Sequence, residues 1–326
     1  MLKPPFTVSA KAINLVAEIS GLVERCAIRL KQADSLLLRK VNRVKTIHGS
    51  LAIEGNSITE RQVSDILDGK HVVAPVRQIQ EVKNAIKTYE LYSQLNPFSV
   101  EDLLNAHGVM MAALADDAGR FRRGNVGVFA GNQAVHIAPP ADRVPGLIAD
   151  LLRWAESAED HLLIRSCVFH YEFEFIHPFS DGNGRMGRLW QSLMLGRLHP
   201  IFEHLPIENM VYANQQAYYE AINVSTERND SGVFIDFMLQ EIFDTLSRFS
   251  KTQHSDVGVN VGVNVGVNEG KLLEVLRGNG NISAKSLADI LKLSPRQVER
   301  LLKVLREKGF IRRVGSDKSG YWEVLF

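Results

Sequence analysis

The sequence predicts a mainly α-helical protein, in which a helical bundle carries one β-hairpin and is followed by a small C-terminal domain. Apolar residues recur at spacings of three and four along most of the stretch from Ala10 to Phe249, as on helices that bury one face. A shorter stretch inside it, residues 118–144, has the alternating pattern of strands. After Lys251 the composition changes abruptly, which indicates that the bundle ends there.

Several segments show the helical spacing clearly, and each is expected to bury its apolar face in the bundle. They are Leu36–His48, Val63–Gly69, Glu81–Leu95, Val100–Leu114 and Arg143–Ala158. Further on, the apolar run Cys167–Ile176 predicts a helix or buried segment, and Arg188–Leu198 has helical spacing again. We therefore expect a loop between these last two segments.

The alternating stretch predicts a hairpin. Val126, Val128, Val135 and Ile137 lie in two short apolar-alternating pieces, separated by the turn sequence Ala-Gly-Asn-Gln at 130–133. Two consecutive prolines end the second piece. The sequence therefore predicts a β-hairpin between two helices.

The loop between the two later helical segments holds most of the chemistry, because residues 177–188 read HPFSDGNGRMGR. Its glycines lie where the next helix begins, and the unpaired N–H groups and positive dipole of a helix N-terminus favour an anion such as phosphate. Arg185 and Arg188 are three apart, so both guanidinium groups project from one helix face. Asp181 offers the hard oxygen that Mg²⁺ accepts, and His177, largely neutral near pH 7, is the expected base. This combination predicts polyphosphate chemistry.

The same stretch resembles the signature of the Fic-domain family, which is HxF, any residue, Asp or Glu, GNGR, two residues and Arg, and every fixed position is filled. The resemblance implies a Fic-type helical bundle with Mg²⁺ as cofactor. It also implies transfer of AMP from ATP to a Ser, Thr or Tyr hydroxyl of a protein target or of the chain itself, with release of pyrophosphate. Family members that act as kinases tend to replace GNGR by a lysine-bearing version, so AMP is the expected group.

The resemblance further implies a role for each matched residue. His177 takes the proton from the attacking hydroxyl, and Asp181 holds Mg²⁺ between the α- and β-phosphates. The nucleotide-binding residues around the phosphates are Gly182, Asn183, Gly184, Arg185 and Arg188. Phe179 is expected to anchor the loop in the core. The structural alternative is a glycine turn that only caps a helix, beside an ordinary structural histidine.

A second motif lies far upstream, where residues 50–56 read SLAIEGN. It resembles the family's inhibitory motif, which is Ser or Thr, three residues, Glu, Gly or Asn, and Asn. The resemblance implies that Glu54 pairs with Arg188 and occupies the γ-phosphate region, with Ser50 as the first motif residue. Some relatives use this glutamate to remove AMP again, and that reverse activity stays open. A plain helix pair followed by a Gly55-Asn56 cap is the structural alternative, and both interpretations are compatible.

Two further segments resemble parts of the same family. The hairpin region 124–140 resembles the flap, whose free backbone groups near Val126 and Val128 would pair with an extended target segment. Residues 214–227 resemble the segment that closes the nucleotide pocket, with Tyr219 as the expected neighbour of adenine and Tyr218 as the alternative. An ordinary surface hairpin and two core tyrosines remain the structural alternatives.

The C-terminal part contains two different patterns. Residues 257–268 repeat VGVN three times, which predicts either an extended strand with its valines on one face or a linker without fixed structure. From residue 271 the order is helix, helix, turn, helix and hairpin, with Pro295 at a helix start and Gly309 at a helix end. This order resembles a winged helix-turn-helix.

The winged region is basic. Residues 271–326 contain twelve Lys and Arg and six Asp and Glu, a balance of +6 in a chain whose formal net charge is +1. This asymmetry favours phosphate contacts, with Arg296 and Arg300 of the third helix in a groove and Arg312, Arg313 or Lys318 of the wing on the backbone. Winged helices also dock proteins or dimerise, so DNA, a protein partner and a homodimer all stay open.

The overall composition is that of a globular protein. With 326 residues, 45% of them hydrophobic and 23% charged, the chain can bury a large core and form a second small domain. The two cysteines, Cys26 and Cys167, have no metal or redox spacing, so we expect a reducing compartment and no disulfide. The sequence lacks a signal-peptide core and a membrane-length apolar run, which predicts a cytoplasmic protein with no membrane partner.

The expected organisation has four parts. These are an N-terminal helical region (1–95), a catalytic core (96–250), a VGVN linker or strand (251–270) and a winged helix-turn-helix (271–326). The first function class is an autoinhibited nucleotidyltransferase that uses ATP, and the second is a DNA-binding regulator whose Fic core senses nucleotide without turnover. The intact signature histidine favours the first class, because sensing requires a phosphate cradle but no base.

Overall fold

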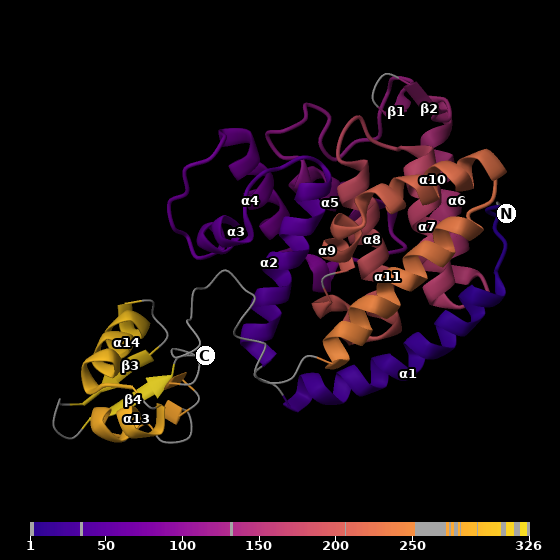
Figure 1. The fold of residues 1–326 in the computed structure, drawn as a ribbon. Coiled ribbons are helices and arrows are strands. Elements are labelled where there is room, and N and C mark those ends of the chain that lie inside the picture. The colour runs from indigo at the N-terminus through magenta and orange to yellow at the C-terminus, as the bar shows by residue number, and fades with distance from the viewer. Residues whose placement is uncertain are drawn as a thin grey trace. The chain divides into compact units, whose positions relative to one another are not determined.

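Figure 1 shows the fold of the chain in a computed structural model. The structure describes residues 3–32, 35–130, 133–205, 207–251, 272–273, 275–276, 280, 282–291, 293–307, 311–315 and 320–324. The chain divides into two compact units, Met1–Ala33 with Arg39–Lys251, and Asp34–Leu38 with Thr252–Phe326.

The larger unit is a helical bundle with one hairpin. Its α-helices are α1 (Ala10–Gln32), α2 (Ser35–Ile53), α3 (Glu60–Leu67), α4 (Val76–Glu90), α5 (Val100–Met110), α6 (Val144–Ser157), α7 (Leu162–Ile176), α8 (Asn183–Leu198), α9 (Ile207–Ala213), α10 (Gln215–Arg228) and α11 (Gly232–Lys251). Short 3₁₀ turns are η1 (Tyr92–Gln94), η2 (Ala141–Arg143) and η3 (Pro200–His204). The predicted mainly α fold is confirmed.

The predicted hairpin is also present. Strands β1 (Gly127–Ala130) and β2 (Gln133–Ile137) pair antiparallel, with Val128 opposite His136 and a register shift after Val128. The tip of the turn, residues 131–132, lies outside the described part.

Helices α7 and α8 form the centre of the bundle. Helix α7 packs against α6, α8 and α11, while α1 runs along α11 (Figure 1). Eleven of the fifteen residues of α7 are buried, so neighbours cover this helix on nearly every side. Close packing of this kind resists small displacements. The end of α7 and the start of α8 are therefore rigid places for functional groups.

Helices α4 and α5 are among those whose bounds differ from the expected ones. Helix α4 begins at Val76 and ends at Glu90, several residues before the predicted segment on both sides. Helix α5 ends at Met110 instead of Leu114, because Ala113 adopts a left-handed φ of 59° that a right-handed helix cannot contain.

Helix α2 ends in a glycine cap. Gly55 has a φ of 85°, and its N–H donates to Ala52 O at 3.0 Å, while the Asn56 N–H donates to Leu51 O at 3.1 Å. These two bonds form the Schellman pattern, in which glycine tolerates a left-handed backbone that other residues adopt at a cost. The cap directly follows Glu54, so it fixes the backbone conformation next to Glu54 and thereby the direction of its side chain.

The smaller unit has the elements of a winged helix-turn-helix, as expected. They are α13 (Ala284–Leu291), α14 (Pro295–Glu307), β3 (Ile311–Val314) and β4 (Tyr321–Val324), and the two strands pair antiparallel. Its core consists of Leu272, Leu276, Leu287, Ala288, Val298, Leu302, Leu305 and Ile311. The VGVN repeat and Lys318 lie outside the described residues.

Two smaller expectations concern the cysteines and membrane segments. Cys26 and Cys167 are both buried and unbridged. In the part of the chain that the structure describes, no helix combines the length and the apolarity needed to cross a membrane.

Candidate functional site

The signature occupies the loop between α7 and α8. His177 directly follows α7 with a left-handed φ of 51°, and Gly182 directly precedes α8 with a φ of 87°. A Cβ at Gly182 would come within 2.8 Å of Met111 Sδ, so glycine is needed there for space as well as for its backbone. The loop thus closes tightly and leaves the first N–H groups of α8 at the site.

Asn183 closes this loop from the inside. Its Nδ2 donates to Phe179 O and its Oδ1 accepts from Phe179 N–H, both at 2.9 Å. Phe179 is fully buried, as its predicted anchoring role requires. The side chain of Asn183 is therefore engaged in shaping the loop, and the phosphate-facing groups of this turn are backbone amides.

His107 on α5 supports the loop and was missed by sequence reasoning. Its Nδ1 accepts from the Gly119 N–H at 2.9 Å, so the proton lies on Nε2, which donates to Asp181 O at 3.0 Å. Its ring stacks on Phe179 with centroids 3.6 Å apart. Burial lowers the pKa of His107, which keeps the ring neutral. A single histidine on a helix carries no sequence signal for such a role.

The imidazole of His177 is half-buried at the end of α7. Its Nδ1 lies 3.3 Å from Glu174 O. Because a carbonyl oxygen only accepts, Nδ1 carries the proton in this contact. Nε2 is then the basic nitrogen of the ring, which is the state that a general base requires.

Asp181 lies beside the start of α8 with its carboxylate 44% exposed. Its Oδ1 accepts from the Gly182 N–H at 2.6 Å and from Arg185 Nη2 at 3.0 Å, and its Oδ2 lies 3.3 Å from Arg77 Nη2. Arg77, on α4, was also missed by sequence reasoning, because it meets Asp181 only through the fold. Its side chain is mostly exposed, so this ion pair is weak.

The surroundings of Asp181 fit Mg²⁺. This ion is typically held by one or two carboxylates together with nucleotide phosphates and waters, and not by an all-protein cage. The described residues include no cluster of three or more His, Cys, Asp or Glu that could hold a metal ion. A half-exposed carboxylate next to a helix N-terminus matches the first arrangement.

Arg185 adds an unused donor to this region. Its guanidinium is buried, and its Nε has no hydrogen-bond partner among the described residues. A buried charged donor without a partner is costly, so its presence favours an anionic ligand such as a phosphate oxygen.

Arg188 is bound from α2 by the upstream motif. Its Nη2 donates to Glu54 Oε1 at 2.7 Å and to Ser50 O at 2.9 Å, and its Nε lies 3.3 Å from Ser50 Oγ. Burial is the largest single influence and lowers the pKa of Arg188, but the charge and hydrogen bond of Glu54, together with the charges of Tyr218 and Glu174, raise the net pKa. The structure thus brings together two residues that lie 134 positions apart in the sequence.

The carboxylate of Glu54 lies against the first turn of α8. A Cβ at Gly184 would overlap Glu54 Oε1 and approach Arg188 Nη1 to 2.8 Å. The helix end favours an anion in this position through its dipole and its unpaired amides. An anionic group of the protein itself therefore occupies a place suited to phosphate.

The two tyrosines of α10 differ in their surroundings. Tyr218 is 2% exposed, and its hydroxyl lies 3.1 Å from His170 Nε2, so it belongs to the core. Tyr219 is 45% exposed, and its pKa is raised by partial burial and by the negative charge of Glu54. Tyr219 therefore lies near the candidate site and remains accessible to a ligand.

Two acids, one partly and one fully buried, lie within electrostatic reach of Arg188. Glu174 on α7 and Glu208 on α9 both have a pKa raised to about 7, chiefly by burial, although Arg188 acts in the opposite direction. The pKa of the neighbouring His170 is lowered to about 3, again by burial. Both carboxyl groups consequently titrate near neutral pH.

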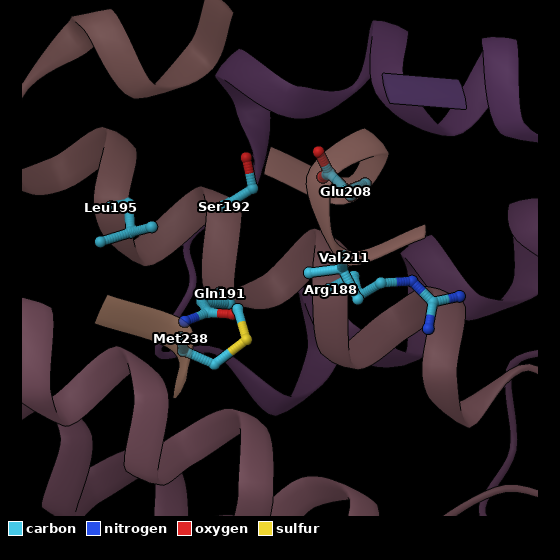
Figure 2. A pocket seen from close by; sticks show the side chains of 7 residues that line it. All are labelled: Arg188, Gln191, Ser192, Leu195, Glu208, Val211 and Met238. Carbon is cyan, nitrogen blue, oxygen red and sulfur yellow. The ribbon is translucent and has the colours of Figure 1, made fainter. Parts of the chain in front are cut away.

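A hollow lies along α8, beyond its first turn. Figure 2 shows the residues that line it: Arg188, Gln191, Ser192, Leu195, Glu208, Val211 and Met238. The guanidinium of Arg188 points away from Gln191 and Met238 in this view. Arg188 lines this hollow and also contacts Glu54 through its Nη2.

The predicted flap residues lie at the hairpin. Val126 is half-buried at its base, and Val126 O accepts from the Ala138 N–H at 3.2 Å. Val128 lies in β1 opposite His136.

The predicted basic residues of the winged unit are placed differently from one another. Arg296 and Arg300 are exposed on α14. Arg312 on β3 is ion-paired with Glu323 on β4, and the guanidinium of Arg313 lies 5.0 Å from the centroid of the Trp322 ring. Helix α14 therefore presents the more available charges.

Comparison with known proteins identifies the class to which this fold and site belong. The family model described as Fic/DOC family matches residues 97–195, and a model described as winged helix-turn-helix DNA-binding matches residues 268–312. The crystal structure of a Fic family protein from Desulfovibrio desulfuricans G20 is 39% identical, with a TM-score of 0.73, and the match covers 99% of this chain and 98% of that one. The chain belongs to the Fic/DOC family and carries a C-terminal winged helix-turn-helix.

More distant relatives cover only part of the chain. Protein adenylyltransferase fic-1 of Caenorhabditis elegans is 27% identical over 219 residues, which are 62% of this chain and 40% of that protein. A probable protein adenylyltransferase of Aquifex aeolicus is 30% identical over 120 residues, which are 36% of this chain and 32% of that protein. The chain thus spans about 40% of the length of the curated fic-1 relatives. A Fic domain containing signaling protein from Bacteroides thetaiotaomicron shares the fold, with a TM-score of 0.58 at 18% identity.

Proposed function

We propose that this protein is an adenylyltransferase that moves AMP from ATP to a Ser, Thr or Tyr hydroxyl of a protein, and that Glu54 holds it in a resting state. The observation that carries the proposal is the contact of Glu54 with Arg188 and with the first turn of α8. One loop and the helix after it carry a helix N-terminus suited to anions, two arginines and a basic imidazole. Nucleotidyl transfer requires these three kinds of group together.

The chemistry follows from the positions of these groups. Nε2 of His177 accepts the proton of the target hydroxyl while its oxygen attacks the α-phosphorus of ATP. A new oxygen–phosphorus bond forms, the bond from the α-phosphorus to the bridging oxygen breaks, and pyrophosphate leaves. The N–H of Gly184 and the Nε of Arg185 stabilise the charge on the phosphate oxygens, while the Gly182 N–H holds the carboxylate of Asp181 in place.

Asp181 would hold Mg²⁺ together with the phosphates. When bound, the ion supplies charge neutralisation on the triphosphate. Arg77 would then release Asp181 and keep its ion pair with Glu81, which lies 3.4 Å away.

Inhibition arises from competition for Arg188. The γ-phosphate and the Glu54 carboxylate require the same guanidinium, so ATP in its productive position must displace Glu54. Ser50 strengthens the resting state, because its carbonyl and hydroxyl orient Arg188 toward α2.

Labelling with α-labelled ATP and Mg²⁺ tests the proposal. The wild type should label weakly, Glu54→Gly strongly, and Glu54→Gly with His177→Ala not at all. The labelled band, whether the chain itself or a protein of the cell extract, identifies the target. Equal labelling with and without His177 would contradict the mechanism. Adding unlabelled wild type to the labelled product then tests for removal of AMP, which would release the label.

A second function is favoured by the winged unit, whose exposed Arg296 and Arg300 lie in a region with a net charge of +6. We propose that this unit contacts DNA through α14. Strong, salt-dependent binding of duplex DNA without any labelling in the Glu54→Gly variant would make the chain a nucleotide-sensing regulator instead of an enzyme.

A further inference from the structure

Arg122, between α5 and β1, has an unusual environment for a charged residue. Its side chain is buried, with the residue only 3% exposed. Among the described residues, its side-chain hydrogen bonds all go to main-chain carbonyl oxygens, and none of them involves a carboxylate. Burial lowers the pKa of this guanidinium, and hydrogen bonds to the carbonyl dipoles compensate for the burial of its charge.

The four carbonyls belong to two different parts of the site. Two lie at the base of the hairpin, where Nη1 donates to Gly124 O at 2.8 Å and Nη2 donates to Pro139 O. The other two lie at the end of α7, where Nε donates to His177 O at 2.7 Å and Nη2 is 3.3 Å from Ile176 O. One planar group therefore joins both ends of the hairpin to the residue that carries the imidazole.

The main chain of Arg122 adds a further connection, because its N–H donates to Pro178 O at 3.0 Å. The main-chain carbonyls of His177 and Pro178 are thus both held by this one residue. His177 has a left-handed backbone, which a non-glycine residue adopts only when its surroundings enforce it. Arg122 supplies such enforcement directly at the strained residue.

A guanidinium is suited to this task and an ammonium is not. Arginine has five N–H donors in a rigid plane, so it can serve carbonyls in several directions at once. Lysine has the same charge on a flexible stem and a single nitrogen, so it cannot reach both the hairpin and the end of α7 in the same geometry.

We propose that Arg122 is a positioning residue, which holds the imidazole of His177 and the target-docking hairpin in a fixed mutual position. This inference rests on the proposed AMP transfer. It assigns to Arg122 the alignment of base and acceptor hydroxyl, and no contact with ATP.

The chain provides a matched control in Arg165. This residue also donates from a partly buried guanidinium to main-chain carbonyls, Ala155 O and Glu156 O, and burial also lowers its pKa. It lies near the start of α7, about 18 Å of helix away from His177. Arg165→Lys therefore removes the same kind of interaction at a place remote from the chemistry.

The test compares Arg122→Lys and Arg165→Lys, each in the Glu54→Gly background. Initial labelling rates with α-labelled ATP give kcat and KM for ATP, and calorimetry gives the Kd of ATP. We expect Arg122→Lys to lower kcat about 10- to 100-fold, because a displacement of reacting groups by about 1 Å has effects of this size. KM and Kd for ATP should stay within about threefold, and Arg165→Lys should leave kcat unchanged.

Three results would overturn the inference. The first is an equal kcat for the two lysine variants at the same folded fraction. The second is a rise of the Kd of ATP in Arg122→Lys that parallels the loss of kcat. The third is that Arg122→Lys fails to fold while Arg165→Lys folds. The last result would assign Arg122 to stability. Absence of label in the Glu54→Gly parent would instead refute the proposed function, so the two failures are distinguishable.

Discussion

At the scale of single residues, neighbouring side chains of one type have quite different surroundings. Tyr218 and Tyr219 are adjacent, yet the first is buried against His170 and the second is exposed near Glu54. Helical geometry separates adjacent residues by about 100° around the axis, so one side chain faces the core while the next faces the site.

This difference predicts opposite effects of mutation. Tyr219→Ala should weaken ATP binding about 3- to 30-fold through loss of contact with adenine. Its melting temperature should stay close to that of the wild type. Tyr218→Phe should leave ATP binding unchanged and lower stability by about 1 kcal/mol, since the His170 hydrogen bond is lost. Calorimetric titration and thermal melts measure the two effects. Weaker ATP binding in Tyr218→Phe alone would reverse the assignment.

The raised pKa of Glu208 predicts a pH-dependent stability. Its pKa rises from 4.5 in the unfolded chain to about 7 in the fold, so the folded state binds more protons between these values. The free energy of unfolding must then fall as pH rises through this window. Glu208→Gln removes this penalty and can keep the hydrogen bond from Tyr89.

We expect Glu208→Gln to be more stable than the wild type at pH 8, by about 1–3 kcal/mol, and to lose this advantage at pH 4.5. Denaturant titrations at the two pH values measure the difference. A gain that is the same at both values would exclude the carboxyl group as its origin.

At the scale of elements, the end of α2 determines how firmly Glu54 is held. Gly55 has a left-handed backbone, and no atom lies within 4 Å of a Cβ placed there, so a side chain would meet a conformational cost but no clash. Gln215 of α10 also donates to Ile53 O at 2.8 Å and ties this end to the bundle.

Gly55→Ala should therefore loosen the cap by about 1 kcal/mol and favour release of Glu54. The expected result is a several-fold rise in labelling by the otherwise wild-type chain. Gly69→Ala is the control, because Gly69 has a similar φ of 72° and open space but follows α3. An equal rise in labelling in both variants would show that the cap at Gly55 has no specific role in inhibition.

At the scale of the whole molecule, charge is unevenly distributed along the chain. The winged region has a balance of +6, while the complete chain has +1, so the rest is acidic. Such separation favours a polyanionic partner for the smaller unit.

The double variant Arg296→Ala with Arg300→Ala tests this in the full chain. Binding to duplex DNA should weaken about 10- to 100-fold. The slope of log K against the logarithm of the salt concentration should become shallower, by the contribution of about two phosphate contacts. Arg153→Ala on α6 serves as a control for loss of charge in the larger unit. Unchanged DNA binding by the double variant would contradict contact through α14, and no DNA binding by the wild-type chain would contradict a nucleic-acid partner altogether.

The features that could be predicted from the sequence are those that depend on short stretches of chain. Helical spacing, the hairpin pattern and the composition change after Lys251 each predicted an element, because local periodicity reflects which side chains face a core. The contiguous signature from His177 to Arg188 likewise predicted a helix start suited to phosphate. The contact between Glu54 and Arg188 was expected only through the family resemblance.

Only the tertiary structure decided which distant residues support that signature. His107, Arg77 and Arg122 reach the loop through contacts with residues that lie tens of positions away, and none belongs to a motif. Their partners are often backbone carbonyls, which every residue possesses and which therefore leave no trace in the sequence. The physical reason is that such groups become ligands or anchors only when folding brings them within hydrogen-bonding distance.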